Sequence, residues 1–179
     1  MKTLEQRARD AAQHVLDTHG LIGQLPIPVE RIAADCGCQI ARNQDATSAI
    51  TSFAVVSAAK DRVIGLNTGQ GVRSQRFAVA HALAHHVMHD REITVCRRIR
   101  ALHREPETVE AGFDAELQAN VFALELLLPT AAVMGAARSH LAGQRDPVRE
   151  ELVKHLAWLF NAPSVAVGAR LVDLAILTP

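Results

Sequence analysis

Residues 73–90 read RSQRFAVAHALAHHVMHD, and this stretch decides which fold and which chemistry the chain can have. Ser74 is a good N-cap residue, so the stretch is predicted to form a helix. On a helix, His81 and His85 lie on one face, about 5–6 Å apart at Cβ, where both imidazoles can bind one metal ion. The familiar zinc motif with this spacing is H-E-x-x-H, but the glutamate position is occupied by Ala82. Either a metal site lacks one residue, or the two histidines share a helix face by chance.

A third metal ligand is predicted in the next helical segment, residues 114–129, which reads DAELQANVFALELLLP. A catalytic zinc site needs three protein ligands, and Glu116 at the start of this segment is the best candidate for the third. Asn120 follows one turn later on the same face. Its side chain is placed to accept a hydrogen bond from the other ring N–H of a ligand histidine and so to fix its tautomer. Ala119 and Ala123 would let the two helices approach closely.

The two segments together resemble the signatures of the ImmA/IrrE family of metallopeptidases. RSQRFAVAHALAHHVMH is similar to R-x-R-F-x-x-A-H-E-x-x-H-x-x-x-H, and ELQANVFALELLLP is similar to E-x-x-A-N-x-F-A-x-x-L-L-x-P. The strands that end in GLN and the closing SVAVGARLVDLAIL keep the family's order, so the resemblance covers roughly residues 25–177. It implies a compact zincin-like core with Glu116 as the third metal ligand. It also implies cleavage of a helix-turn-helix repressor, which releases genes for stress response or mobile-element transfer.

The rest of the chain predicts an α+β fold. We expect one mostly helical, zincin-like domain over residues 1–179, with a small β-sheet that precedes the metal-binding helix. An N-terminal helix lies within residues 1–20, and C-terminal helices over residues 147–179 are expected to pack on the core. Residues 91–112 are charged and give no clear assignment. Hydrophobic periodicity and turn residues predict the remaining elements, which are a helix over 3–18, a short helix at VERIAADCG, strands over 49–57 and 62–67, and helix starts at Pro147 and Ser164.

The composition limits the compartment and the partners. Hydrophobic residues make up 49% of the chain and Lys plus Arg balance Asp plus Glu at 19 each, so no global charge attracts nucleic acid or a membrane. The N-terminus, MKTLEQRARD, is too polar for a signal peptide, and no apolar run is long enough to span a bilayer. Only Cys36, Cys38 and Cys96 are present, which favours a reducing cytoplasm over a disulfide framework. The C-x-C pair is expected to be structural. We therefore expect a cytoplasmic protein without direct nucleic-acid or membrane binding.

Ala82 determines which chemistry is expected of the site. In H-E-x-x-H sites the glutamate takes a proton from the attacking water and passes it to the leaving amine. Such acid–base catalysis contributes about 10²–10⁴-fold, so peptidase activity is expected to be close to undetectable. His86 is a weak candidate for a replacement base. His89 is expected to lie at the polar end of the helix or behind a ligand, and Glu125 is expected to point elsewhere.

Two explanations of Ala82 remain open. One is a natural pseudo-enzyme that binds its partner without cutting it, and the other is a deliberate Glu→Ala change that traps an inactive protein. All the other predicted site residues are in place, whereas drift after loss of function would erode buried ligands because they are costly to desolvate. The isolated loss favours a zinc-dependent endopeptidase of the ImmA/IrrE type, disabled at one position, with manganese as the alternative metal. The competing hypothesis is a pseudo-protease that regulates a helix-turn-helix partner by binding.

Three further features have weaker functional interpretations. The chain contains no tyrosine, so oxyanion stabilisation would depend on residues such as His103, His140 or His155, each of which is more typical of a surface histidine. The basic run CRRIRALHR, residues 96–104, is followed at once by glutamates and is interpreted as a solvated loop that borders the cleft. The final helix pair is strongly apolar, which predicts packing on the core or a partner surface.

Overall fold

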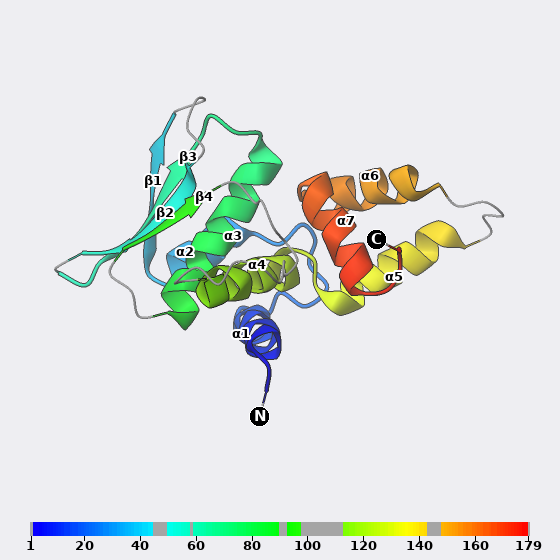
Figure 1. Cartoon of the computed structure of the whole chain (residues 1–179), viewed down its shortest axis with the longest axis horizontal. Helices are drawn as coiled ribbons and strands as arrows, with labels where there is room; N and C mark the ends of the chain where they lie inside the picture. Colours follow the sequence, from blue (N-terminus) through cyan, green and yellow to red (C-terminus); the bar gives the residue numbers. More distant parts are fainter. Residues whose placement is uncertain are drawn as a thin grey trace.

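The structure, a computed structural model, describes residues 2–44, 50–57, 59–89, 93–97, 113–142 and 148–178. It is an α+β fold in which a small mixed sheet lies beside a larger set of helices, so the predicted fold class is confirmed (Figure 1). The elements within the described residues are α1 (Leu4–Thr18), α2 (Val29–Asp35), β1 (Cys38–Asn43), β2 (Ile50–Val56), β3 (Arg62–Asn67), α3 (Val72–Met88), β4 (Ile93–Arg97), α4 (Phe113–Leu127), α5 (Thr130–Leu141), α6 (Arg149–Leu159) and α7 (Ser164–Asp173).

The four strands are ordered β1-β3-β2-β4 across the sheet. Strand β1 pairs with β3 in parallel, and β2 is antiparallel to both β3 and β4. The predicted strands over 49–57 and 62–67 are confirmed as β2 and β3. Strands β1 and β4 were not predicted, and β4 follows α3 in the chain. The sheet is therefore not confined to residues before the histidine helix, because a strand from the segment left unassigned completes it.

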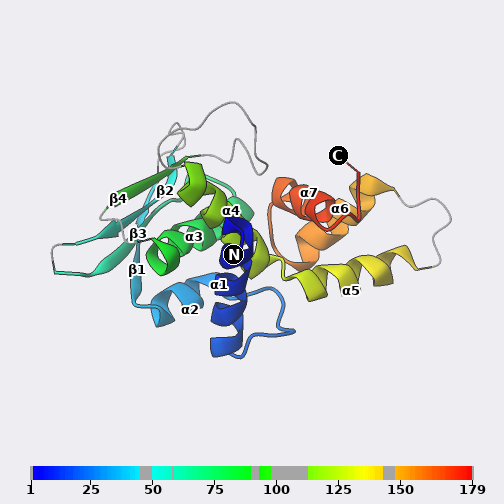
Figure 2. The ribbon, with the colours of Figure 1, turned by 60° about the horizontal axis from the view of Figure 1, so that its bottom comes forward.

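Helix α3 is the central element of the fold. It packs on the sheet through β2 and β3, α4 packs against it, and α1 packs against α4 (Figures 1 and 2). All its residues from Phe77 to His86 are buried, which is typical of a helix covered on every side. Helix α1 is instead amphipathic and buries only one stripe, formed by Ala8, Ala12, Val15 and Leu16. A covered central helix keeps the polar side chains of α3 away from bulk water.

The N-terminus of α3 differs from the prediction. The helix begins at Val72, so Ser74 lies inside its first turn and is not the N-cap. The side-chain amide of Gln75 instead donates hydrogen bonds to the carbonyl oxygens of Thr68 and Gln70, at 3.3 and 2.6 Å. These bonds fasten the preceding loop to the first turn of α3.

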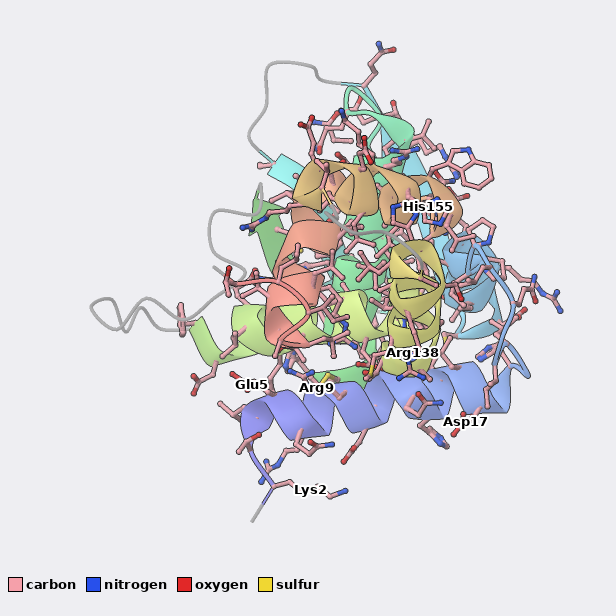
Figure 3. The ribbon with its side chains drawn as sticks, turned by 90° about the vertical axis from the view of Figure 1, so that its right-hand side faces the viewer. Lys2, Glu5, Arg9, Asp17, Arg138 and His155 are labelled. Carbon is pink, nitrogen blue, oxygen red and sulfur yellow. The ribbon has the colours of Figure 1, made fainter. Side chains whose placement is uncertain are left out.

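A buried arginine joins the C-terminal helices to α4. Arg170 of α7 is 1% exposed, and its guanidinium donates to the carbonyl oxygen of Leu128 at 3.1 Å, to Asp173 at 2.7 Å and to Glu125. Asp173 in turn accepts two hydrogen bonds from Arg9, at 2.9 and 3.0 Å. Figure 3 shows Arg9 on the side of α1 that faces the rest of the protein, opposite to Lys2. Glu125 therefore belongs to an ion-pair network that connects α1, α4 and α7.

One contiguous cluster of buried apolar side chains extends from α1 to α7. It includes Leu156, Phe160 and Leu171 from the predicted apolar helix pair, whereas Trp158 and Val165 from the same helices are 70% and 60% exposed. The pair thus contributes both to the core and to the surface. Among the described residues, no single helix is long and apolar enough to cross a membrane, and only α4 and α5 taken together, with a 55° bend, reach that length and composition.

Candidate metal centre

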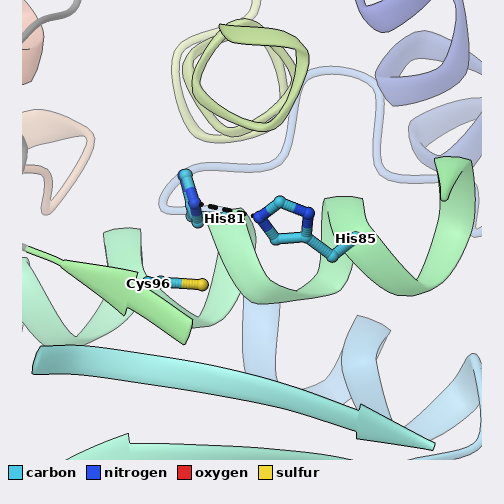
Figure 4. A group of neighbouring side chains, drawn as sticks. All are labelled: His81, His85 and Cys96. Atoms are coloured by element: carbon cyan, nitrogen blue, oxygen red, sulfur yellow. Dashed lines mark hydrogen bonds between the residues drawn. The ribbon is translucent and has the colours of Figure 1, made fainter. Parts of the chain in front are cut away.

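Helix α3 brings the two predicted ligand histidines together. His81 and His85 lie one turn apart, and their Nε2 atoms are 3.2 Å from each other (Figure 4). Both side chains are buried, with 6% and 3% of each residue exposed. Both rings are buried and their Nε2 atoms face each other. Chance placement of two histidines on one helix face does not explain this arrangement.

Glu116 from α4 faces both rings. Its Oε2 atom is 3.2 Å from Nε2 of His81, and its Oε1 atom is 3.3 Å from Nε2 of His85. Ala119 and Ala123 are fully buried between the packed helices, and their small side chains allow α4 to approach α3 closely. The predicted set of two histidines and one glutamate is therefore brought together by the fold.

The donor atoms of this cluster fit a divalent metal ion. Ligands that bind a tetrahedral zinc ion at about 2.0–2.1 Å lie about 3.3 Å from one another. The distances between the Nε2 atoms and the carboxylate oxygens, 3.2 to 3.3 Å, match this spacing. Lone pairs that face one another at this distance repel unless a proton or a metal cation lies among them. The chemistry and the spacing of the donors both fit zinc.

Asn120 controls the orientation of His81. The Oδ1 atom of Asn120 lies 2.9 Å from Nδ1 of His81, and both residues are buried. An amide oxygen only accepts hydrogen bonds, so Nδ1 carries the proton and Nε2 presents its lone pair to the cluster. The sequence predicted that Asn120 accepts a hydrogen bond from a histidine of the cluster, and the geometry of Asn120 and His81 matches that prediction.

A second hydrogen-bond chain orients His85, and it passes through His89. Nδ1 of His85 is 3.1 Å from Nδ1 of His89, whose Nε2 is 3.2 Å from Oε1 of Gln118. The side-chain nitrogen of Gln118 donates to the carbonyl oxygen of Leu4 in α1 at 3.4 Å, which leaves its oxygen to accept from His89. His89 then carries its proton on Nε2 and accepts from Nδ1–H of His85. The free lone pair of His85 is on Nε2, which faces Glu116.

The role of Asn120 is open to a direct test. Asn120→Ala is expected to lower zinc affinity about 10–100-fold, because the tautomer and ring angle of His81 are no longer held. Asn120→Asp keeps an acceptor oxygen at the same place and is expected to restore most of the affinity. Competition with a chromophoric chelator measures both variants, and circular dichroism follows the fold. A loss of affinity accompanied by unfolding would instead identify Asn120 as a residue that the core needs.

Cys96 was not predicted as part of the site, yet it adjoins both histidines. It is 1% exposed on β4, and its sulfur and one ring nitrogen of each histidine lie within 4.8 Å of one another (Figure 4). Residues Ile93–Arg97 form a strand, so interpreting the run from residue 96 as a loop was wrong for its first residues. Residues 98–104 lie outside the described part of the chain. Cys36 and Cys38 are free thiols distant in sequence from the site, and burial raises the pKa of Cys38 to about 11.

The electrostatics of the cluster favour a cation among its donors. Burial lowers the pKa of His81, but hydrogen bonds that its ring donates to Cys96 and Glu116 outweigh burial and raise this pKa to about 10. The pKa of Cys96 is raised by burial and lowered more strongly by both histidines, to about 7. The pKa of Glu116 is lowered well below its usual range, since the facing imidazoles outweigh its burial. In the metal-free protein these two acidic groups favour a proton on Nε2 of the imidazoles. A metal dication can replace that proton, and Nε2 then offers its lone pair to the metal.

No described side chain next to Ala82 supplies the missing base. Ala82 is fully buried on α3. His86, the residue considered as a replacement, has its Nε2 atom 3.2 Å from the carbonyl oxygen of Val63 in β3, and its pKa is lowered by burial. Its imidazole donates a hydrogen bond to the sheet, so it does not serve as the base at position 82. The site therefore combines the cluster of donor atoms with a buried apolar residue at position 82, where an H-E-x-x-H motif has glutamate.

A cavity of about 420 Å³ adjoins His81. Phe77 and Ala78 of α3 form one wall beside His81, and Pro163 and Val165 at the start of α7 form another. The loop between β3 and α3, Thr51 of β2 and Ser74 of α3 also line the cavity. The cluster thus borders a space large enough for one or two side chains of a bound peptide.

Two of the three loose candidates for oxyanion stabilisation, His140 and His155, are described by the structure and do not line the cavity at this site. His140 of α5 and His155 of α6 stack on each other, with ring centroids 4.5 Å apart, and neither lines the cavity beside His81. Both are half-buried and thus partly exposed to solvent. His103 lies outside the described residues.

The comparisons with known proteins agree with this geometry. The family model described as the IrrE N-terminal-like domain, Peptidase_M78, matches residues 33–172 of the chain. This range covers most of the chain and contains α3, β4 and α4, which carry every residue of the cluster. A search of curated proteins gave no match.

Proposed function

Because this chain belongs to the IrrE N-terminal-like family of metallopeptidases, we propose that His81, His85 and Glu116 bind one zinc ion in a site built for peptide hydrolysis. The observation that carries the proposal is the convergence of two Nε2 atoms and one carboxylate at 3.2 to 3.3 Å, the spacing of zinc ligands. Manganese is the alternative metal, since the same donors accept it.

The protein residues have separate roles in this proposal. A bound zinc ion would supply Lewis-acid chemistry, polarising the peptide carbonyl and lowering the pKa of water. Asn120 and His89 hold the two imidazoles in the tautomers whose Nε2 atoms face Glu116. Ala82 has no group that takes up a proton, so the acid–base part of the reaction is missing. In this proposal the chain is a zinc-dependent endopeptidase of its family that lacks the acid–base residue at position 82.

The proposed partner is a helix-turn-helix repressor, held as an uncleaved ligand. An exposed apolar surface supports docking of a protein partner, because Trp158 of α6 and Val165 of α7 are 70% and 60% exposed. Val165 also lines the cavity that adjoins His81. The alternative function, a pseudo-protease that regulates the repressor by binding alone, is favoured by the alanine at position 82.

Metal analysis tests the site. Purified wild-type protein is expected to hold about one zinc ion per chain after dialysis, and His81→Ala is expected to hold none, because two ligands no longer chelate the ion. His86→Ala is the matched control, since this neighbouring histidine bonds to the sheet and not to the cluster. Equal metal content in wild type and His81→Ala would contradict the assignment.

Partner binding is tested separately. Helix-turn-helix repressors from the same genome are mixed with the zinc-loaded protein, and complex formation is measured by calorimetry. We expect one repressor to bind, and Trp158→Ala to weaken that binding without changing the metal content. If the zinc-loaded protein binds none of the repressors, the proposed partner is wrong, whereas the proposed metal site is unaffected.

A further inference from the structure

Cys96 is held against the histidine pair by the backbone of two strands. It pairs opposite Ser52 of β2, and its carbonyl oxygen accepts a hydrogen bond from Oγ1 of Thr51 at 3.3 Å. The hydroxyl of Ser52 donates to the carbonyl oxygen of Ala78 in α3 at 3.2 Å, which fastens β2 to the histidine helix. Sheet pairing thus determines the position of the Cys96 sulfur, which lies within 4.8 Å of one ring nitrogen of each histidine.

The thiol and the glutamate approach the histidines from different elements. Glu116 extends from α4 and Cys96 from β4, and in Figure 4 these two elements lie on opposite sides of the two rings. The two imidazole nitrogens therefore have a carboxylate within 3.2 to 3.3 Å from α4 and a sulfur within 4.8 Å from β4. Zinc accepts all three kinds of ligand, and thiolate is a soft ligand that it binds strongly.

We propose that Cys96 is the fourth protein ligand of the zinc ion, so that the centre is closed by His81, His85, Glu116 and Cys96. The inference rests on the proposed function, since it takes the three-ligand zinc site as given. Structural zinc sites have four protein ligands, whereas catalytic sites keep one position open for water or substrate. A centre closed by Cys96 has no such position.

The proposed closed centre and the alanine at position 82 would have the same consequence. A base at position 82 serves only a water molecule that attacks beside the metal. Where a thiolate takes the fourth position, no water stands there, and a glutamate would have no proton to accept. In this chain the metal then holds α3, α4 and β4 together as a structural ion.

Cobalt substitution and X-ray absorption test the ligand directly. In the Co²⁺ form, a bound thiolate produces an intense charge-transfer band in the near-ultraviolet that imidazole and carboxylate ligands do not produce. In the zinc form, X-ray absorption is expected to show one sulfur at about 2.3 Å. The variants are Cys96→Ser and, as a matched control, Cys38→Ser, which removes a different buried cysteine on β1.

We expect the band and the sulfur in wild type and in Cys38→Ser, and their complete loss in Cys96→Ser, which still binds metal through the other three ligands. Wild-type protein that binds metal without band or sulfur overturns the inference and leaves the proposed function intact. Wild-type protein that takes up no metal contradicts the proposed function and the inference together. The absorption measurement on unaltered protein does not depend on how well any variant folds.

Discussion

A chain that carries both Ala82→Glu and Cys96→Ser is expected to cleave a helix-turn-helix repressor about 10²–10⁴ times faster than the Cys96→Ser chain, the range supplied by acid–base catalysis. The glutamate would follow His81 on α3, where a carboxylate can take the proton of the attacking water and return it to the leaving amine. The second change removes the thiol within 4.8 Å of both imidazoles and leaves room for that water. Ala82→Glu alone is expected to stay nearly inactive.

The measurement is a gel of the repressor incubated with each variant, with and without a chelator. Ala82→Gln combined with Cys96→Ser is the matched control, because glutamine has the size of glutamate and accepts no proton. Position 82 is fully buried, so thermal unfolding and metal content are measured for every variant. If the double variant folds, holds zinc and binds the repressor without cutting it, the protein is a non-catalytic regulator.

Arg170→Met is expected to lower the free energy of unfolding by about 3–5 kcal/mol, the range found when one partner of a buried ion pair is removed. The guanidinium is 1% exposed and bonds Glu125, which is itself 4% exposed. Without it, the carboxylate of Glu125 keeps only its hydrogen bonds from Thr130 and remains buried without a counter-ion. The carbonyl oxygen of Leu128 loses its donor as well.

Urea unfolding followed by circular dichroism measures this effect. Arg9→Ala, at the partly exposed end of the same network, is expected to cost at most about 1 kcal/mol. Glu125→Leu combined with Arg170→Met removes both charges and is expected to be more stable than Arg170→Met alone. A change below about 1 kcal/mol for Arg170→Met would show that water replaces the arginine without loss.

The elements that depend on local pattern were predictable from the sequence. Helical periodicity identified α1, α3 and α4, and alternation with flanking turns identified β2 and β3, all with bounds close to those observed. The cluster of His81, His85 and Glu116 could be predicted because the two histidines lie one turn apart on a helix and Glu116 begins the next apolar helix. Its spacing rests on helix geometry, which the sequence encodes directly.

The remaining site residues depend on contacts between distant segments. Cys96 begins the charged run CRRIRALHR and reaches the histidines only because β4 pairs with β2, a pairing that has no local signal in a five-residue edge strand. The alternation within ITVC predicts that Ile93 and Val95 face the core, but in the structure these two side chains are exposed and Cys96 is buried. His89 likewise acquires its role from Gln118, which lies on another helix.

Helix α1 lies outside the residues matched by the family model, and yet it takes part in the hydrogen-bond chain behind His85 through the carbonyl oxygen of Leu4. This limits how the protein can be shortened for recombinant work. A fragment trimmed to residues 33–172 would uncover the apolar face of α4 against which Ala8, Ala12 and Val15 pack. Such a fragment would be prone to aggregate, and its Gln118 would lose one anchor. Fragments intended for metal or crystallisation work should therefore begin before Thr3, the residue that caps α1.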